Sequence, residues 1–155
     1  MEDVNSWQLK FQPCCYSDKF LNELYELNEK VDNPVDINEI KKAIFYARKY
    51  HGTQIRQSGE PYYSHPIEVA YMLARYAAKE EIRYFRTDLL VTSVLHDTIE
   101  DTKLTFNMIT DIFGAIVAEQ VEDLTRIKNG LKLSAAETVR SLWLQKKSDV
   151  LLMAH

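Results

Sequence analysis

The 155-residue chain is poor in cysteine, glycine and proline, with two, four and four residues respectively. Its cysteines are neighbours, Cys14 and Cys15, so they lack the CxxC spacing of zinc and redox motifs, and a disulfide between adjacent residues is strained. No Asn-Gly or Asp-Gly turn lies between alternating apolar runs, so nothing indicates β-hairpins. The shortage of cysteine predicts a reduced, cytoplasmic protein.

The chain also lacks long apolar runs and an excess of basic residues. No stretch of about 18 apolar residues occurs, so we expect no membrane span, and the N-terminus (MEDVNSWQLK) has early acids and no apolar segment typical of a secretory signal. Nineteen basic residues against 23 acidic ones give a net charge of −4, which argues against nonspecific nucleic-acid binding. A local basic pocket for a phosphorylated small molecule remains compatible with this charge.

What the chain does have is helical periodicity, with 46% hydrophobic and 27% charged residues, enough for one packed core. These features predict an all-α single domain. Ser17, Asp36 and Thr87 stand where helix caps are expected, Gly114 separates two helices, and Ser134 starts the last one. The expected helices span residues 18–30, 37–51, 62–76, 88–101, 105–113, 115–128 and 134 onward.

The expected organisation is an N-terminal extension with one helix over residues 1–35, followed by the main domain over residues 36–155. The last expected helix is still running at Leu151, Leu152 and Met153 when the sequence stops. We therefore expect a C-terminally incomplete domain, truncated in its last helix, whose apolar flank favours self-association.

The segment LLVTSVLHDTIEDT, residues 89–102, carries the sharpest chemical signal. In a continuous helix, His96, Asp97, Glu100 and Asp101 fall within an arc of about 140°. Three carboxylates and an imidazole on a partly buried face need compensation, and a divalent cation provides it. The alternative is a charged helix end in water, although acids near a helix C-terminus are slightly unfavourable.

A second polar segment, RQSGEPYYSHP, covers residues 56–66. His65 is expected in the opening turn of a helix, where a histidine can bind a ligand or simply cap the helix. Arg56 offers a planar guanidinium that can stack on a base or pair with phosphate. The alternative for Arg56 is a solvated loop arginine.

Taken together, the two segments resemble a known family. The pattern Arg56-x-Ser-Gly-Glu-Pro-Tyr-x-x-His65-Pro66, followed by His96-Asp97-Thr-Ile-Glu-Asp-Thr102, is similar to the HD-type hydrolase domain of the RelA/SpoT homologue family. Proteins of that family make and degrade the guanosine alarmones ppGpp and pppGpp. The likeness runs from about residue 43 to residue 149, roughly two thirds of the chain, and residues 1–35 match nothing in the family.

The resemblance implies a metal centre and an acidic pair. His65, His96 and Asp97 match positions where the family ligates a divalent ion, usually Mn²⁺. Glu100 and Asp101 match the acids that activate or orient the attacking water.

The resemblance also implies a substrate pocket. Arg56 matches the arginine that contacts the guanine base, Ser58 lines the same pocket, and Gln57 stands where hydrolase-competent members usually carry a basic residue. The family's fourth metal ligand is a late aspartate. Asp149 matches an earlier acid of that stretch, and the ligand position would fall just beyond His155.

The implied activity is (p)ppGpp 3′-pyrophosphohydrolysis, which releases pyrophosphate and returns GDP or GTP in the degradation of the stringent-response alarmone. The expected partner is this small-molecule substrate, with neither nucleic acid nor membrane. Two other hypotheses remain open. One is a catalytically inactive truncated remnant or nucleotide-binding module, and the other is hydrolysis of a different phosphorylated nucleotide.

Overall fold

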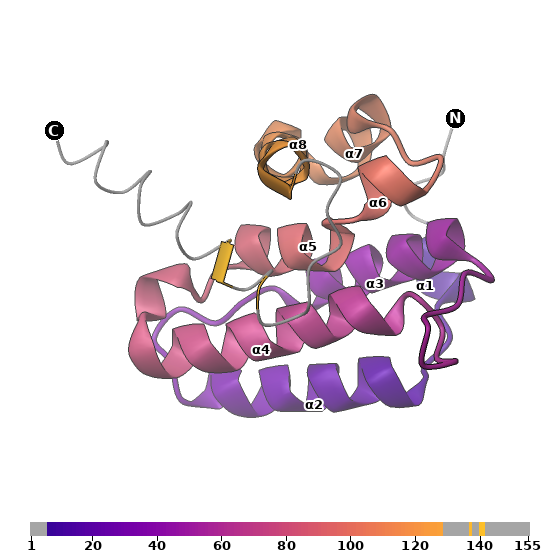
Figure 1. Cartoon of the computed structure of the whole chain (residues 1–155). Coiled ribbons are helices and arrows are strands. Elements are labelled where there is room, and N and C mark those ends of the chain that lie inside the picture. Colours follow the sequence, from indigo (N-terminus) through magenta and orange to yellow (C-terminus); the bar gives the residue numbers. More distant parts are fainter. Residues whose placement is uncertain (1–5, 129–136, 138–139, 142–155) are drawn as a thin grey trace, which may run out of the picture.

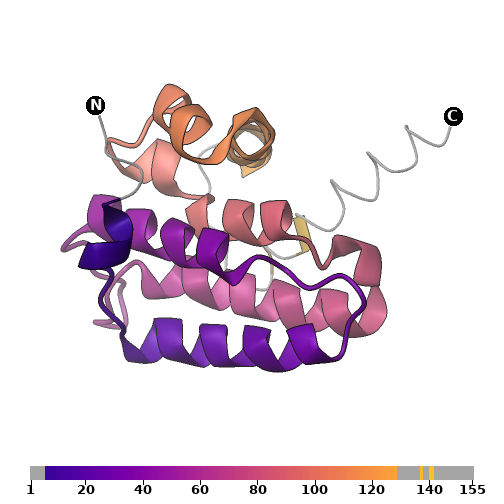
Figure 2. The same cartoon turned by 180° about the vertical axis from the view of Figure 1, so that it is seen from behind.

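A computed structural model shows helices packed in layers and describes residues 6–128, 137, 140 and 141 (Figure 1). The elements of residues 6–128 are α1 Trp7–Lys10, α2 Cys15–Glu29, α3 Ile37–His51, α4 Ser64–Glu80, the 3₁₀ turn η1 Ile82–Tyr84, α5 Thr87–Leu95, α6 Thr98–Asp101, α7 Phe106–Phe113 and α8 Ala115–Lys128. Helices α2 and α4 lie side by side at one side of the molecule, α3 and α5 form the middle, and α8 packs on the far side of α5 beside α7 (Figure 1, Figure 2). The predicted all-α single domain is confirmed over this part of the chain.

Helix α5 lies at the centre of this arrangement. All of its residues from Leu89 to Leu95 are buried, and it contacts α3, α4 and α8. Five of its nine residues are apolar, and its two fully buried hydroxyls, those of Thr92 and Ser93, donate to the backbone carbonyls of Asp88 and Leu89 within the helix, so no buried hydroxyl of this helix lacks an acceptor. The residues that follow it are thereby held inside the domain.

Several predicted helix boundaries are confirmed. Helix α3 has the bounds that its periodicity predicted, and Asp36 caps it by accepting hydrogen bonds from the backbone N–H groups of Asn38 (3.0 Å) and Glu39 (3.4 Å). Gly114 separates α7 from α8 at φ 100°, a conformation that favours glycine. No helix among the described residues has both the length and the apolar character needed to cross a bilayer.

Two predicted caps are wrong. Helix α2 begins at Cys15 with Cys14 as its N-cap, and Ser17 lies inside the first turn, where its hydroxyl accepts from the Cys14 N–H and donates to the Cys14 carbonyl, both at 3.0 Å. Thr87 is the first residue of α5, and its hydroxyl accepts from the N–H of Asp36 at 2.9 Å. The Ser17 hydroxyl thus still contributes to the start of α2, as the third residue of a capping box, whereas the Thr87 hydroxyl bonds the residue that caps α3.

The helix start predicted at residue 62 falls two residues later, since α4 runs from Ser64 to Glu80. The short elements α1 and η1 are too brief to leave a periodic signal and were not predicted. The division at residue 35 stays a prediction, and α2 packs on α4 within the same core. The last predicted helix falls, apart from residues 137, 140 and 141, outside the described residues.

The prediction of one continuous helix over residues 88–101 is also wrong, because the helix is interrupted at His96 and Asp97, between α5 and α6. The His96 ring donates from Nδ1 to the Ser93 carbonyl at 2.6 Å, and the Thr98 hydroxyl donates to the Leu95 carbonyl at 2.7 Å. These side chains occupy carbonyl oxygens that a regular helix would pair with backbone N–H groups. His96 and Asp97 therefore stand at a helix junction rather than on one face of a helix.

The Asp36 cap supports a stability prediction. Asp36→Ala should destabilise the fold by about 0.5–2 kcal/mol, because two N–H groups of α3 lose their acceptor. Thermal unfolding should show a midpoint lower by a few degrees, about 2–4 °C per kcal/mol for a chain of this size. Asp36→Ser retains an acceptor and should recover most of the loss, and the exposed Asp32→Ala is the matched control. Equal midpoints for Asp36→Ala and the control would contradict this role.

Candidate metal centre

Three potential metal ligands gather inside the domain, from two places far apart in the sequence. His65 lies in the first turn of α4, while His96 and Asp97 lie at the α5–α6 junction. One ligand atom from each residue lies within 4.8 Å of the others, and all three side chains are buried. The structure thus brings together the three residues predicted as metal ligands, and this group could hold a metal ion.

The Asp97 carboxylate is the centre of the group. Its Oδ2 atom is 3.2 Å from His96 Nε2 and 3.9 Å from His65 Nε2. The rings of His65 and His96 meet edge to face, with centroids 5.3 Å apart. Two nitrogens and one carboxylate oxygen thus converge, a donor set suited to a divalent cation.

The ring of His96 is set for ligation. Its Nδ1 atom donates to the Ser93 carbonyl, which can only accept, so the neutral ring carries its lone pair on Nε2. That Nε2 atom is buried and has no hydrogen-bond partner. A buried nitrogen without a partner costs free energy, which a bound cation would recover. Metal-ligating histidines in general have their second ring nitrogen held in this way.

Tyr62 connects the centre to the acid on α6, a role that the sequence analysis did not assign. The Tyr62 hydroxyl donates to Asp97 Oδ2 at 2.6 Å and lies 3.4 Å from Asp101 Oδ2. Burial, with the charges of Asp97 and Asp101 adding to it, raises the pKa of the Tyr62 phenol far above its ordinary value, so the hydroxyl remains a donor. The available signal was its position three residues before His65.

His51 and Gln54 support the same region and were also not predicted. The centroids of the His51 and Tyr62 rings are 4.9 Å apart, and the Nδ1 atom of His51 lies 3.1 Å from Gln54 Oε1. The Gln54 amide in turn donates to the backbone carbonyl of Asp101 at 2.9 Å. Burial lowers the pKa of His51, which favours the neutral form of this ring behind Tyr62.

The predicted acidic pair lies on α6, the short helix after the junction. Asp101 is tied to the centre through Tyr62, as described above. Glu100 is half-buried on the same turn of helix, three residues after Asp97. The catalytic roles given to these two acids stay predictions.

Two of the three predicted substrate-binding residues line a cavity of about 350 Å³ between the 56–60 loop, α2 and α4. Arg56 and Ser58 are among its lining residues, whereas Gln57 is exposed and is not. The Arg56 guanidinium is 3.5 Å from the Glu68 carboxylate and 3.4 Å from the Ser64 hydroxyl, next to His65 in sequence. None of the three metal-centre residues is among the lining residues of this cavity.

Comparison with known proteins identifies the family of this chain. The sequence model of the HD domain family matches residues 43–149. A GTP pyrophosphokinase rsh of Brucella ovis is 40% identical over 133 residues, which cover 81% of this chain and 17% of that protein. A guanosine-3′,5′-bis(diphosphate) 3′-pyrophosphohydrolase of Aquifex aeolicus is 38% identical over 117 residues, 75% of this chain and 16% of that protein. A GTP pyrophosphokinase of Myxococcus xanthus is 41% identical over 104 residues, 67% of this chain and 12% of that protein.

The matched region therefore covers most of this chain and a small part of each relative. The chain spans between about an eighth and a sixth of the length of the curated relatives it matches. Its matched residues include the helices that bring His65, His96 and Asp97 together. Asp149, the predicted match to a late family acid, and His155 lie outside the described residues.

Proposed function

We propose that this chain is a divalent-metal-dependent (p)ppGpp 3′-pyrophosphohydrolase. The chain belongs to the HD domain family, and within it to the RelA/SpoT proteins. The reaction would use water to release the 3′-diphosphate as pyrophosphate and return GDP or GTP. The observation that carries this proposal is the buried group of His65, His96 and Asp97, in which the Nε2 atom of His96 has no hydrogen-bond partner. The name of the Aquifex aeolicus relative supplies the substrate class.

The metal we propose is Mn²⁺. The three residues offer imidazole nitrogen and carboxylate oxygen with no thiolate, which suits manganese or a similar ion better than a structural zinc site. When bound, a divalent cation supplies a Lewis acid that neutralises diphosphate charge and lowers the pKa of water. His65, His96 and Asp97 would hold it.

The acids on α6 would take part in proton transfer from the attacking water. We assign Asp101 and Glu100 to accept a proton from the attacking water and to orient it. The Tyr62 hydroxyl, at 2.6 Å from Asp97 Oδ2 and 3.4 Å from Asp101 Oδ2, holds the two carboxylates in a fixed relation. It also offsets part of the repulsion between them.

The substrate side of the proposal rests on the 56–60 loop. The Arg56 guanidinium would contact the guanine base, and Ser58 would line the same pocket. Gln57 is exposed, so it would reach the anionic part of the nucleotide only from the rim. A glutamine there donates a hydrogen bond but carries no positive charge.

The test is pyrophosphate release from ppGpp by the purified chain with Mn²⁺, with His96→Ala as the inactive reference. We expect release that chelation abolishes and that the variant lacks. Absence of release above the variant, in a chain shown to be folded by circular dichroism, would refute catalysis and leave a binding module. GTP and ATP assayed beside ppGpp decide whether another nucleotide is the substrate.

Tyr62 gives a prediction of its own, as a positioning residue. Tyr62→Phe should weaken Mn²⁺ binding by about 10–100-fold, the usual cost of losing a group that orients a metal ligand. Binding measured by isothermal titration calorimetry checks this, with the half-exposed Tyr25→Phe as the matched control.

A merely structural role for Tyr62 would give a different pattern. It would lower the unfolding midpoint of the metal-free chain while leaving the Mn²⁺ affinity of the folded fraction unchanged. That pattern would contradict the positioning role.

Two further points concern the cellular compartment and the oligomeric state of the protein. Cys14 and Cys15 are both free thiols, which supports a reducing compartment such as the cytoplasm. Self-association stays a prediction, which light scattering tests.

A further inference from the structure

The cavity between the 56–60 loop, α2 and α4 is lined by an acid, Glu68, that has no role in the proposed function so far. Glu68 lies on α4, one turn after Ser64, and lines this cavity of about 350 Å³ together with Arg56. Its half-exposed carboxylate has one oxygen, Oε2, at 3.5 Å from Nη1 of the Arg56 guanidinium. A carboxylate and a guanidinium thus lie side by side at the wall of one cavity.

Arg56 is not a free cation in this cavity. Besides its contact with Glu68, its Nη1 atom lies 4.0 Å from the Glu60 carboxylate and donates to the Ser64 hydroxyl at 3.4 Å. Two carboxylates therefore already compensate the charge of Arg56, which weakens its attraction for phosphate. What Arg56 and Glu68 offer to a ligand is a group of hydrogen-bond donors directly beside a group of acceptors.

This order of donors and acceptors matches one edge of guanine. Along that edge guanine presents the O6 acceptor, then the N1–H donor, then the N2 amino donor. The Arg56 guanidinium has only donors and suits O6, whereas the Glu68 carboxylate has only acceptors and suits the two donors. Adenine presents the opposite order, an amino donor followed by the N1 acceptor, so both contacts would be repulsive.

The walls of the cavity suit a flat ring. Tyr16 and Phe20 of α2 and Tyr71 of α4 line it, so two helices contribute aromatic side chains to the same cavity. Aromatic rings stack on every base because every base has a π-face. Stacking would therefore supply affinity for a base, and the polar groups at its edge would decide which base binds.

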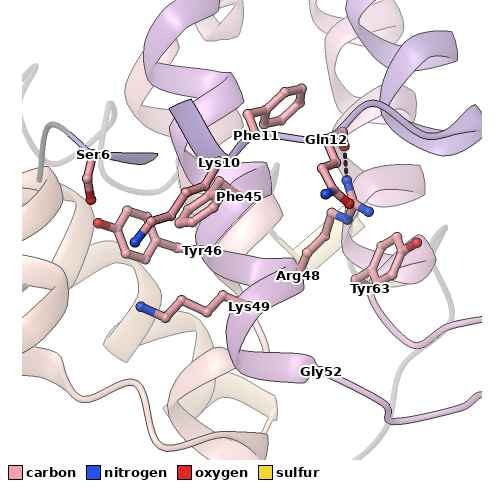
Figure 3. A pocket seen from close by; sticks show the side chains of 10 residues that line it. All are labelled: Ser6, Lys10, Phe11, Gln12, Phe45, Tyr46, Arg48, Lys49, Gly52 and Tyr63. Atoms are coloured by element: carbon pink, nitrogen blue, oxygen red, sulfur yellow. Dashed lines mark hydrogen bonds between the residues drawn. The ribbon is translucent and has the colours of Figure 1, made fainter. Parts of the chain in front are cut away.

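The Tyr16 wall is fixed in the free chain. The ring of Tyr16 meets that of Tyr63 edge to face, with centroids 6.2 Å apart, and the Arg48 guanidinium lies 4.9 Å from the centroid of the Tyr63 ring. Arg48 also donates to the backbone carbonyl of Gln12, the bond that is dashed in Figure 3. Gln12, Arg48 and Tyr63 line another cavity, of about 670 Å³, beside α3. Because these contacts already hold Tyr16, a base would not have to order this wall on binding.

We infer that Glu68 determines a preference for guanine over adenine, by accepting hydrogen bonds from N1–H and the N2 amino group while Arg56 donates to O6. The inference rests on the proposed function for the kind of ligand, a guanine nucleotide, and it uses neither the metal centre nor catalysis. The family resemblance gives no role to the position of Glu68.

The experiment is calorimetric titration of the full chain with GDP, inosine diphosphate and ADP, in EDTA so that no metal-dependent turnover occurs. We expect GDP to bind at least about 10-fold more tightly than ADP, because a site with a fixed hydrogen-bonding pattern rejects a base that cannot meet it. Inosine diphosphate lacks the N2 amino group and should bind with intermediate affinity, since one hydrogen bond to a charged acceptor is lost.

Glu68→Gln should reduce the ratio of GDP affinity to ADP affinity to less than about 3-fold, because an amide can accept from guanine and can equally donate to N1 of adenine. GDP and ADP carry the same charge, so the loss of one negative charge from the protein affects both alike and cancels in the ratio. Glu68 is exposed, so the substitution should leave the fold intact. Glu80→Gln removes the same charge at an exposed position on α4 outside the cavity, and this matched control should keep the parent ratio.

Three results would overturn the inference: no binding of GDP, equal binding of GDP and ADP by the parent chain, or an unchanged ratio in Glu68→Gln. The outcome is separable from that of the proposed function. A chain that prefers GDP through Glu68 but releases no pyrophosphate from ppGpp would refute the hydrolysis and support the role of Glu68.

Discussion

Asp97→Asn is expected to weaken Mn²⁺ binding by at least about 100-fold, more than the 10–100-fold usual for residues that only support a metal ligand. The substitution keeps the shape of the side chain and an oxygen that can accept from the Tyr62 hydroxyl, but it removes the negative charge. Both His65 Nε2 and His96 Nε2 lie within 4 Å of that charge. Without it, the two imidazoles would face a divalent cation without the carboxylate charge that lies between them.

The loss is measurable without turnover. Mn²⁺ at about 100 times its Kd should stabilise the parent chain by about 2.7 kcal/mol through mass action, about 5–10 °C in the unfolding midpoint. In Asp97→Asn the addition of Mn²⁺ should move the midpoint by a degree or less. The exposed Asp111→Asn is the control and should respond as the parent does. A full shift in Asp97→Asn would place the metal elsewhere.

Leu90→Ala has the second large effect, on stability alone. Leu90 is fully buried on α5, which contacts α3, α4 and α8, so its truncation opens a cavity where several helices meet. Such substitutions cost about 2–5 kcal/mol. Denaturant unfolding should show this loss, while Leu90→Met, which conserves volume, should lose less than about 1.5 kcal/mol.

Leu9→Ala is the matched control for Leu90→Ala, because Leu9 is 93% exposed and its truncation should change stability by less than about 0.5 kcal/mol. A loss below about 1 kcal/mol for Leu90→Ala would contradict the central position of α5.

The sequence predicted best what depends on periodicity and composition. Helix α3 follows from its apolar spacing and from Asp36, and α8 follows from the residues after Gly114. The gathering of His65 with His96 and Asp97 was predicted through the family resemblance, since nothing in their spacing brings residues 65 and 96 together. Their role as metal ligands stays a prediction.

What the sequence did not predict depends on side chains that bind the backbone. The break at His96 and Asp97 requires the hydrogen bonds to the Ser93 and Leu95 carbonyls, and a pattern of apolar and polar residues contains no information about them. Tyr62 was missed for a related reason. A tyrosine in a sequence indicates packing before any other role, and only the fold shows that the Tyr62 hydroxyl reaches Asp97, 35 residues away.

The loop between α3 and α4 is held by hydrogen bonds at both ends, which has a consequence for the energetics of binding any ligand there. Its backbone is closed by hydrogen bonds from Arg56 N–H to the Glu60 carbonyl (2.8 Å) and from Tyr62 N–H to the Gln54 carbonyl (2.8 Å). The side chains of Gln54 and Tyr62 then fasten it to Asp101 and Asp97. Arg56 and Ser58 thus belong to a preorganised loop. A nucleotide that binds there would pay little conformational entropy for ordering this loop, so little affinity would be lost.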